Sequence, residues 1–217
     1  MRISEVCRRA GIPLSAMKFY QREGLIPEGR RSHPNQVEYD DAHVTRVRLV
    51  RALLETGGLS VAAAREVIAV LDAPDAPLAE TFAVAQHAIS ASRTAGGAPS
   101  EESRERVRRL AREHRWVTTD DNPGIETAAR ALDGFRGIGF DPPPGYLDAY
   151  AAAAARAAAA DLHALTTRSE TDRVAELMVV GTVLGDPLFA GLRRLAQQDA
   201  TTELFPVPGT PRDEDPS

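Results

Sequence analysis

Residues 1–40 read MRISEVCRRAGIPLSAMKFYQREGLIPEGRRSHPNQVEYD, and this stretch predicts the fold of the N-terminal part of the chain. A short amphipathic run, for which Ser4 is the expected N-cap, ends at Gly11, a residue type that permits a sharp turn. A second helix then begins near Pro13, because proline is tolerated only at a helix start, and it stops at Gly24. Two short helices joined by such a turn predict a helix-turn-helix.

The second helix carries side chains that suit contact with a DNA major groove. Lys18 and Arg22 are cations one turn apart on one face, and a lysine ammonium can hold a phosphate. Phe19 and Tyr20 can belong to the core of a small helical domain or can contact a thymine methyl, a sugar or a base edge. We expect one of the two residues to lie in the core and the other to face DNA. The DNA contacts predicted from this helix are Ser15, Ala16, Lys18, Phe19, Tyr20 and Arg22.

The segment that follows predicts a two-stranded wing. Residues 28–40 contain a glycine, two arginines, a Pro-Asn turn and a short alternating strand. The arginines lie at the base of the wing, where they can bind the phosphates that flank a recognition helix. The DNA contacts predicted from the wing are Arg30, Arg31, Asn35 and Tyr39.

These motifs resemble those of the MerR family of bacterial transcription regulators. The resemblance covers about the first 71 residues, a third of the chain, with three separated motifs in order. The matching positions are Lys18, Tyr20, Gly24, Leu25, Tyr39, Asp40, Leu49, Leu53, Gly58, Leu59, Ser60 and Val61. The chain departs from the family at Val37 and Glu38, where the family commonly has an arginine, and a carboxylate there would repel a phosphate.

The resemblance implies a transcription regulator that binds a pseudo-palindromic promoter site as a homodimer and distorts the DNA for RNA polymerase. The alternative is a helical protein-interaction module with a degenerate helix-turn-helix, which Val37 and Glu38 favour. In the family, the helix after the DNA-binding domain pairs with its mate in the dimer. Leu78, Phe82 and Ile89 belong to a two-heptad seam at this position, although packing on the chain's own C-terminal domain explains the seam equally well.

Composition and charge indicate how the chain is divided and in which cellular compartment it is expected. The net charge is −5, yet residues 1–70 hold 11 Lys and Arg against 8 Asp and Glu, and residues 71–217 hold 15 against 23. A basic head on an acidic body fits a DNA-binding domain joined to a different domain. The single cysteine, Cys7, predicts a buried thiol in a reducing cytoplasm. We find no signal pattern and no run of about 18 strongly apolar residues, so we expect a cytoplasmic, nucleoid-associated protein with no membrane partner.

The periodicity of the remaining chain predicts further helices, one capped by Ser100 and the others over residues 41–55, 60–71, 78–93, 126–135, 146–166, 171–184 and 187–198. The predicted fold is therefore mostly α. It comprises a winged helix-turn-helix DNA-binding domain (1–71), a linker and dimerisation helix (72–98), an all-α C-terminal effector or interaction domain (99–205) and a disordered tail (206–217).

Catalytic and metal-binding patterns are absent from the sequence. The five histidines are scattered and no Cys-x-x-Cys or His-Glu-x-x-His pattern occurs, so we predict no enzyme, no cofactor and no metal site. Soft-metal sensing is excluded by the lack of cysteines after Cys7. An organic effector in the C-terminal domain is compatible with the sequence, with core packing as the alternative role of each aromatic. The residues expected to line its pocket are Trp116, Tyr146, Tyr150, Met178 and Phe189.

Overall fold

The computed structural model describes residues 1–33, 36–73, 77–92, 97–166 and 171–205. Its elements are α1 (Ile3–Ala10), α2 (Leu14–Arg22), β1 (Arg30–His33), β2 (Gln36–Glu38), α3 (Asp41–Arg51), the π-helical turn η1 (Ala52–Thr56), α4 (Val61–Asp72), α5 (Leu78–Ser92), α6 (Glu101–Glu113), α7 (Pro123–Gly137), α8 (Tyr146–Thr166) and α9 (Thr171–Leu204). The prediction of a mostly α-helical protein is confirmed. Two predictions, Asn35 as a DNA contact and the tail over 206–217, lie outside the described residues.

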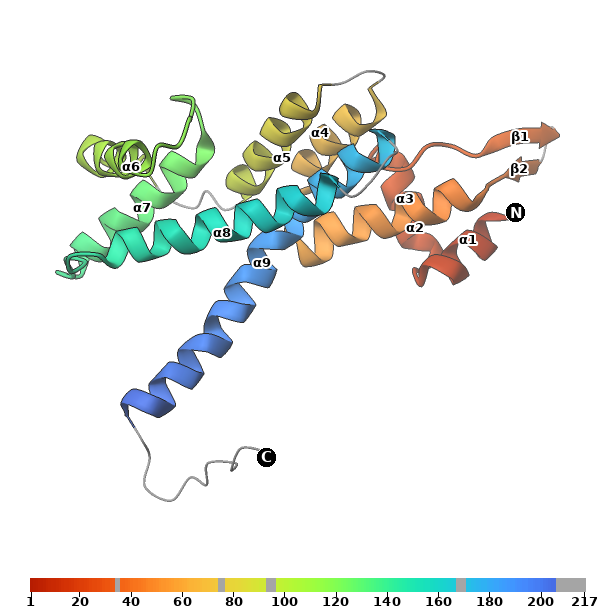
Figure 1. Cartoon of the computed structure of the whole chain (residues 1–217). Coiled ribbons are helices and arrows are strands. Elements are labelled where there is room, and N and C mark those ends of the chain that lie inside the picture. Colours follow the sequence, from red (N-terminus) through yellow and green to blue (C-terminus); the bar gives the residue numbers. More distant parts are fainter. Residues whose placement is uncertain (34–35, 74–76, 93–96, 167–170, 206–217) are drawn as a thin grey trace.

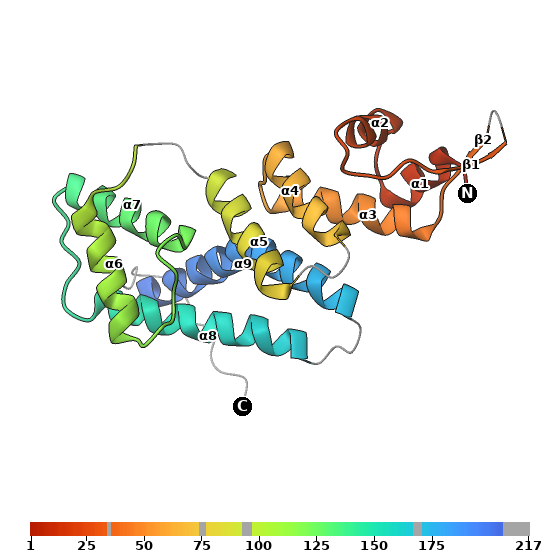
Figure 2. The same ribbon diagram turned by 90° about the horizontal axis from the view of Figure 1, so that it is seen from above.

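The elements form an elongated molecule. The head, residues 1–71 with α1 to α4, η1 and the two strands, lies at one end, and α6 and α7 lie at the other (Figures 1 and 2). Helix α5 and the first half of α9 lie between them and contact each other and α4. The head and the C-terminal helices are therefore joined through a packed middle layer.

The helix-turn-helix forms because two glycines adopt the left-handed backbone that ends a helix. Gly11 follows α1 with φ of 68°, and Gly24 follows α2 with φ of 72°. Side chains other than glycine rarely adopt this conformation, so these two residues fix where both helices stop. The predicted N-cap Ser4 is wrong, because the extended N-cap residue of α1 is Arg2, which makes no side-chain cap.

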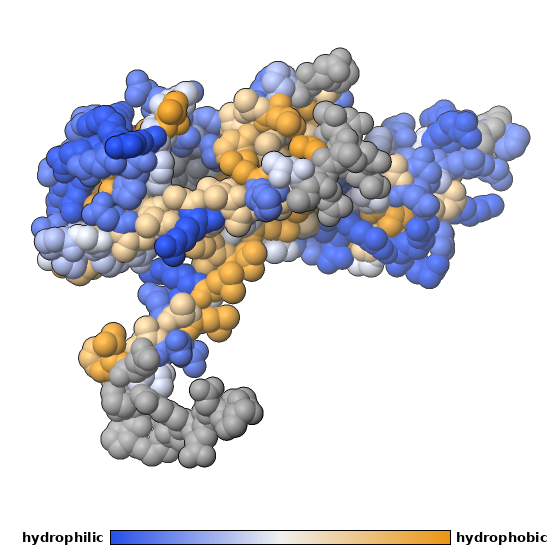
Figure 3. Space-filling model, in the orientation of Figure 1, coloured by the Kyte–Doolittle hydropathy of each residue, from blue (hydrophilic) through white to orange (hydrophobic). Residues whose placement is uncertain are grey.

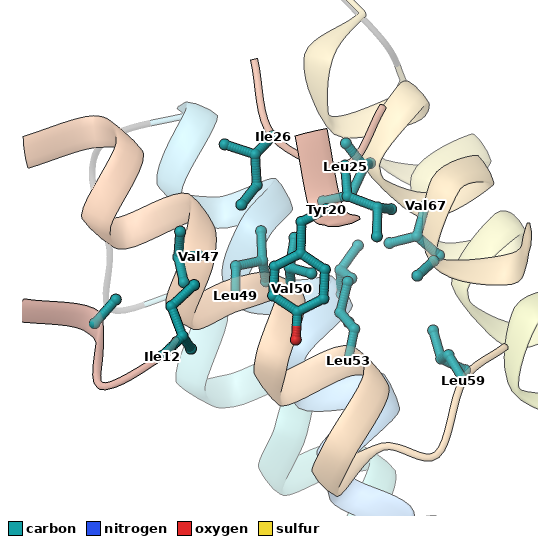
Figure 4. Packing of buried hydrophobic residues seen from close by; sticks show 14 of the residues in the cluster. Ile12, Tyr20, Leu25, Ile26, Val47, Leu49, Val50, Leu53, Leu59 and Val67 are labelled. Carbon is teal, nitrogen blue, oxygen red and sulfur yellow. The ribbon is translucent and has the colours of Figure 1, made fainter. Parts of the chain in front are cut away.

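One hydrophobic core connects the head to the middle layer. The largest side chains buried in the head are Met17, Leu25, Leu53, Val6, Val47 and Val50. Figure 4 shows the ring of Tyr20 among labelled residues of this cluster. The same cluster includes Ala85 and Ile89 of α5 and Val179 and Val183 of α9. Apolar packing is therefore continuous across residue 71, the predicted end of the DNA-binding domain.

Helix α5 uses its apolar seam within its own chain. Ala85 is fully buried and Ile89 is 7% exposed, and α5 contacts α4, α9 and α7. The second half of the seam therefore packs on the chain's own helices, whereas Leu78 at its start is 40% exposed.

Helix α9 is a single helix, whereas the sequence predicted two, over residues 171–184 and 187–198. Pro187 lies inside it, although an interior proline removes one backbone hydrogen bond at a cost of about 3 kcal/mol. Apolar contacts on both sides hold the helix in line, since Val183 packs in the head core and Phe189 lines a cavity beside α8. These contacts outweigh the missing hydrogen bond.

One stretch, Val174–Thr202 of α9, is long and apolar enough to cross a membrane by length and composition alone. The expectation that no such stretch exists is therefore wrong. Helices that form the core of a soluble protein have the same length and composition. Val179 and Val183 in its first half are buried in the protein core.

Candidate nucleic-acid interface and effector cavity

Helix α2 exposes a narrow polar ridge. Ser15, Lys18 and Arg22 are exposed and are spaced by three and four residues, which places them on one face of the helix. Ala16 and Phe19 are half-buried beside this ridge, and the Arg22 guanidinium lies 5.4 Å from the centre of the Phe19 ring. The ridge combines cations, a hydroxyl and part of an aromatic face, which suits contact with phosphates and base edges.

Tyr20 and Tyr39 are buried, so the prediction that they contact DNA is corrected. Tyr20 is 7% exposed, and its burial raises the pKa of its hydroxyl. Tyr39 is 9% exposed, and its hydroxyl oxygen accepts a hydrogen bond from Gln21 of α2 at 3.2 Å. The head is small and uses both rings to fill its core, where each ring supports α2. At the end of α2, Arg65 of α4 donates to the carbonyl oxygen of Glu23 at 2.9 Å.

The predicted wing is present as an antiparallel pair of strands. Arg30 faces Glu38 and Arg31 faces Val37 across the pair. Both arginines are exposed, and as neighbours in a strand they point to opposite faces of the ribbon. An Arg30 nitrogen lies 3.9 Å from a Glu38 oxygen. The acidic residue that departs from the family pattern therefore has a cationic partner within the wing.

The turn between α1 and α2 is held by two arginines of α3. Arg48 of α3 donates to the carbonyl oxygen of Arg9 at 3.1 Å, and Arg51 donates to that of Ala10 at 3.3 Å. The last carbonyl groups of a helix lack partners within the helix, and cations stabilise that end. No local pattern predicts these bonds, because donor and acceptor are 39 and 41 residues apart.

A cavity of about 520 Å³ lies among α6, α7, α8 and α9. Four of the five residues predicted to line an effector pocket do line it, namely Trp116, Tyr146, Tyr150 and Phe189. The fifth, Met178, is buried elsewhere, because it lies eleven residues before Phe189 on the same helix, a separation of roughly 16 Å. The lining residues that the sequence did not single out include Val107, Leu110, Ile125, Leu132, Phe135, Leu147, Ala151 and Ala154.

Two tyrosines of α8 line the cavity and form hydrogen bonds with each other and with α9. The rings of Tyr146 and Tyr150 stack with their centres 4.9 Å apart, and the Tyr146 hydroxyl donates to that of Tyr150 at 3.2 Å. Arg193 of α9 donates to the Tyr150 oxygen from two nitrogens, at 3.1 and 2.7 Å. The hydrogen bonds from Tyr146 and Arg193 lower the pKa of Tyr150. The mainly apolar wall of the cavity thus includes two tyrosine rings that hydrogen bonds hold in place.

Metal ligands do not cluster in the part of the chain that the structure describes: no group of three or more His, Cys, Asp or Glu residues there could hold a metal ion. Cys7 is buried in the head, and burial raises the pKa of its thiol. A raised pKa keeps the sulfur protonated, the form that binds metals poorly.

Comparison with known proteins identifies the head. Residues 1–71 match the sequence model of the family described as MerR HTH family regulatory protein. These residues form a MerR-family helix-turn-helix domain. The mercuric resistance operon regulatory protein of Serratia marcescens is 36% identical over 55 residues, which make up 25% of this chain. The match spans 38% of the length of that curated relative, so it concerns the MerR-family domain alone.

Two solved structures are similar to the chain. The crystal structure of SCO5550, a candidate transcriptional regulator of Streptomyces coelicolor A3(2), has a TM-score of 0.66 and 25% identity, and the match covers 95% of this chain and 99% of that one. The similarity therefore includes the C-terminal helices as well as the MerR-family domain. The lead(II) complex of the regulator PbrR691 of Ralstonia metallidurans CH34 has 26% identity and covers 58% of this chain and 97% of that one, with a TM-score of only 0.38.

Proposed function

We propose that this protein is a MerR-type transcription regulator that binds a pseudo-palindromic promoter site as a homodimer and distorts the DNA for RNA polymerase. The observation that carries the proposal is the exposed ridge of Ser15, Lys18 and Arg22 within a MerR-family domain. In the proposed complex, α2 enters the major groove and a wing arginine contacts flanking phosphates. Arg48 and Arg51 hold α1 against α3, which keeps these contacts in fixed positions while the DNA deforms.

We favour DNA binding over the alternative of an interaction module with a degenerate helix-turn-helix. That alternative rests on Val37 and Glu38, neither of which can hold a phosphate, and on the negative charge of Glu38, which would repel DNA. That charge lies 3.9 Å from Arg30, and Lys18, Arg22 and Arg31 are exposed in the same head.

The cavity supports a second part of the proposal, a small organic effector. Its volume falls within the usual range of roughly 300–1,000 Å³ for ligand sites, and its walls are mainly apolar with a few polar groups. Helix α9 joins this cavity to the head, because Phe189 lines the cavity and Val183 packs against the head core near Gly57. An effector that binds better when Phe189 is displaced would favour a different position of α9 against the head.

DNA binding is tested by fluorescence anisotropy with the promoter region of the protein's own gene, over a series of salt concentrations. Lys18→Ala is expected to weaken binding to every sequence about equally and to lower the salt slope by about one, because one phosphate contact is lost. The matched control is Arg112→Ala, an exposed cation on α6 paired with Glu105. An unchanged slope for Lys18→Ala, or no binding by the wild type to any promoter fragment, contradicts the proposal.

Effector binding is tested by thermal unfolding with a panel of apolar organic compounds. A compound at a hundred times its dissociation constant stabilises the native state by about 2.7 kcal/mol. Ala154→Phe fills part of the cavity and is expected to abolish the stabilisation. Ala158→Phe is the control, since Ala158 is an exposed residue one turn further along α8 that does not line the cavity. A stabilisation that survives Ala154→Phe would place the compound elsewhere.

A further inference from the structure

The wall of the cavity among α6, α7, α8 and α9 contains no charged group. The cavity has a volume of about 520 Å³, and none of the described residues that line it is Asp, Glu, Lys, Arg or His. The outside of the same region differs, since Figure 3 shows a largely hydrophilic surface over α6. The wall therefore offers a ligand no formal charge to pair with.

Aromatic rings in this wall remain partly exposed to water. Trp116, Tyr150 and Phe189 line the cavity and are 37, 42 and 40% exposed. Phe135 and Tyr146 add two further rings to the wall, with their centres 6.3 Å apart. Because apolar surface in a concave site gains free energy when it is removed from water, these rings favour an apolar partner.

Three polar side chains of the wall are already engaged within the protein. The Tyr150 oxygen accepts hydrogen bonds from Tyr146 at 3.2 Å and from two nitrogens of Arg193, at 3.1 and 2.7 Å. The amide oxygen of Asn122 accepts from the backbone N–H two residues later at 2.8 Å, and its nitrogen donates to Gln86 of α5 at 3.5 Å. These groups hold the wall in place and do not need a ligand to satisfy them.

We infer that the cavity takes an uncharged, largely apolar aromatic compound. The inference rests on the effector part of the proposed function and names the chemical class of that effector. A charged group that enters the cavity loses its hydration, and the wall returns no opposite charge in exchange. An uncharged ring loses little hydration and gains contact with the aromatic wall, where edge-to-face or offset-stacked ring pairs add to the burial of apolar surface.

Three other occupants fit the cavity less well. An organic anion would need Arg193, but that guanidinium does not line the cavity and already donates to Tyr150. An organic cation would need a carboxylate, and the described lining residues supply none. Residues 206–217 of the chain itself carry four charged side chains, so their burial would bring charges against the apolar wall.

The test is fluorescence titration of the full-length protein with two dyes that share one ring system. N-phenyl-1-naphthylamine is uncharged, whereas 8-anilino-1-naphthalenesulfonate has the same rings and a sulfonate. We expect the uncharged dye to bind at least about tenfold more tightly, because the sulfonate would enter without a partner. Ala154→Phe should abolish binding of the uncharged dye, and Ala158→Phe should bind it like the wild type, since only Ala154 lines the cavity.

A competition experiment extends the comparison to cations. The uncharged 1-ethylnaphthalene should displace the bound uncharged dye, and 1-naphthylmethylammonium, a cation of similar size, should not. Displacement by both compounds at similar concentrations would overturn the inference. Binding of the sulfonate dye as tight as that of the uncharged dye would also overturn it, and a loss of that binding in Arg193→Gln would assign the cavity to anions.

The remaining outcomes separate the inference from the proposed function. Binding of the uncharged dye that survives Ala154→Phe, or binding of neither dye by the wild type, would overturn the inference, while DNA binding keeps its own test. If the uncharged dye binds as expected but leaves the affinity for promoter DNA unchanged, the chemical class of the ligand stands and the effector role fails.

Discussion

Replacing Gly57 by alanine is expected to lower the free energy of unfolding through one contact between the head and α9. The backbone of Gly57 has φ of −74° and ψ of −19°, which alanine adopts freely. A Cβ atom there would overlap Cγ1 of Val183 and would lie 2.8 Å from the carbonyl oxygen of Leu53. Val183 is fully buried, so it has little room to move. Inserting a methyl group into such a packed site costs about 1–3 kcal/mol.

A double-mutant cycle with Val183→Ala isolates this contact. Val183→Ala alone removes two buried methyl groups and is expected to cost on the order of 1–3 kcal/mol. The smaller side chain also makes room for the new Cβ, so the double variant should be more stable than the sum of the single effects by about 0.5 kcal/mol or more. The compensation should be partial, because the carbonyl oxygen of Leu53 remains close to the Cβ of residue 57.

The assay is urea unfolding followed by circular dichroism, with the free energy of each variant taken from the linear dependence on urea. The control is Gly58→Ala, which has open space around its Cβ but a φ of +70° that strains any other residue. Val183→Ala should not relieve that strain, so the Gly58 cycle should be additive within about 0.5 kcal/mol. A Gly57→Ala variant as stable as the wild type, or an additive Gly57 cycle, would refute the close packing of α9 on the head.

Three further predictions concern charge and metal binding. Glu38→Arg should tighten DNA binding by exchanging repulsion for a phosphate contact, with a gain that shrinks as salt rises; weaker binding in an anisotropy titration would mean that the pair with Arg30 holds the wing in place. The pKa of Asp133 is lowered from 3.8 to about 2, because its carboxylate accepts hydrogen bonds from two serine hydroxyls and a backbone N–H. This carboxylate therefore stabilises the fold above pH 4, and the contribution is lost as the pH falls through about 2. Asp133→Asn should lower the melting temperature at pH 7, the deficit should narrow between pH 4 and 2, and Asp199→Asn should show neither effect. Zinc, copper or mercury should not stabilise the protein in thermal unfolding, and a stabilisation that persists after Cys7→Ser would show that a site without thiolate exists.

Local sequence patterns predicted much of the secondary structure. Gly11 and Gly24 end their helices because only glycine adopts left-handed backbone at little cost. The side chains of Ser60 and Ser100 cap α4 and α6. Each hydroxyl oxygen accepts a hydrogen bond from the backbone N–H three residues later in the chain, within one helical turn. The family of the head could also be predicted, since its motifs are short runs with fixed spacing.

Tertiary packing decided which aromatic residues lie in the core and which lie at the surface. Phe19 and Tyr20 are adjacent in sequence and similar in chemistry, yet Tyr20 packs in the core and Phe19 is half-exposed beside Arg22. Which of the two faces inward depends on where α3 lies against α2, and no pattern within one helix records that position. The lining of the cavity among α6, α7, α8 and α9 was predictable in part, since four of the five predicted residues line it, but the exclusion of Met178 follows from the path of α9.

The sequence by itself thus determined most of the helices, the glycine-marked ends of α1 and α2 and the family of the head, because these depend on hydrogen bonds and periodicity over a few residues. Tertiary structure alone decided that Arg48 and Arg51 hold the α1 carbonyl groups and that the second half of the α5 seam packs against α9. It also decided that α9 continues through Pro187. Each of these outcomes depends on the difference in free energy between burying one apolar or charged surface and burying another that lies far along the chain. No local stretch of sequence contains both surfaces, so local patterns cannot predict the result.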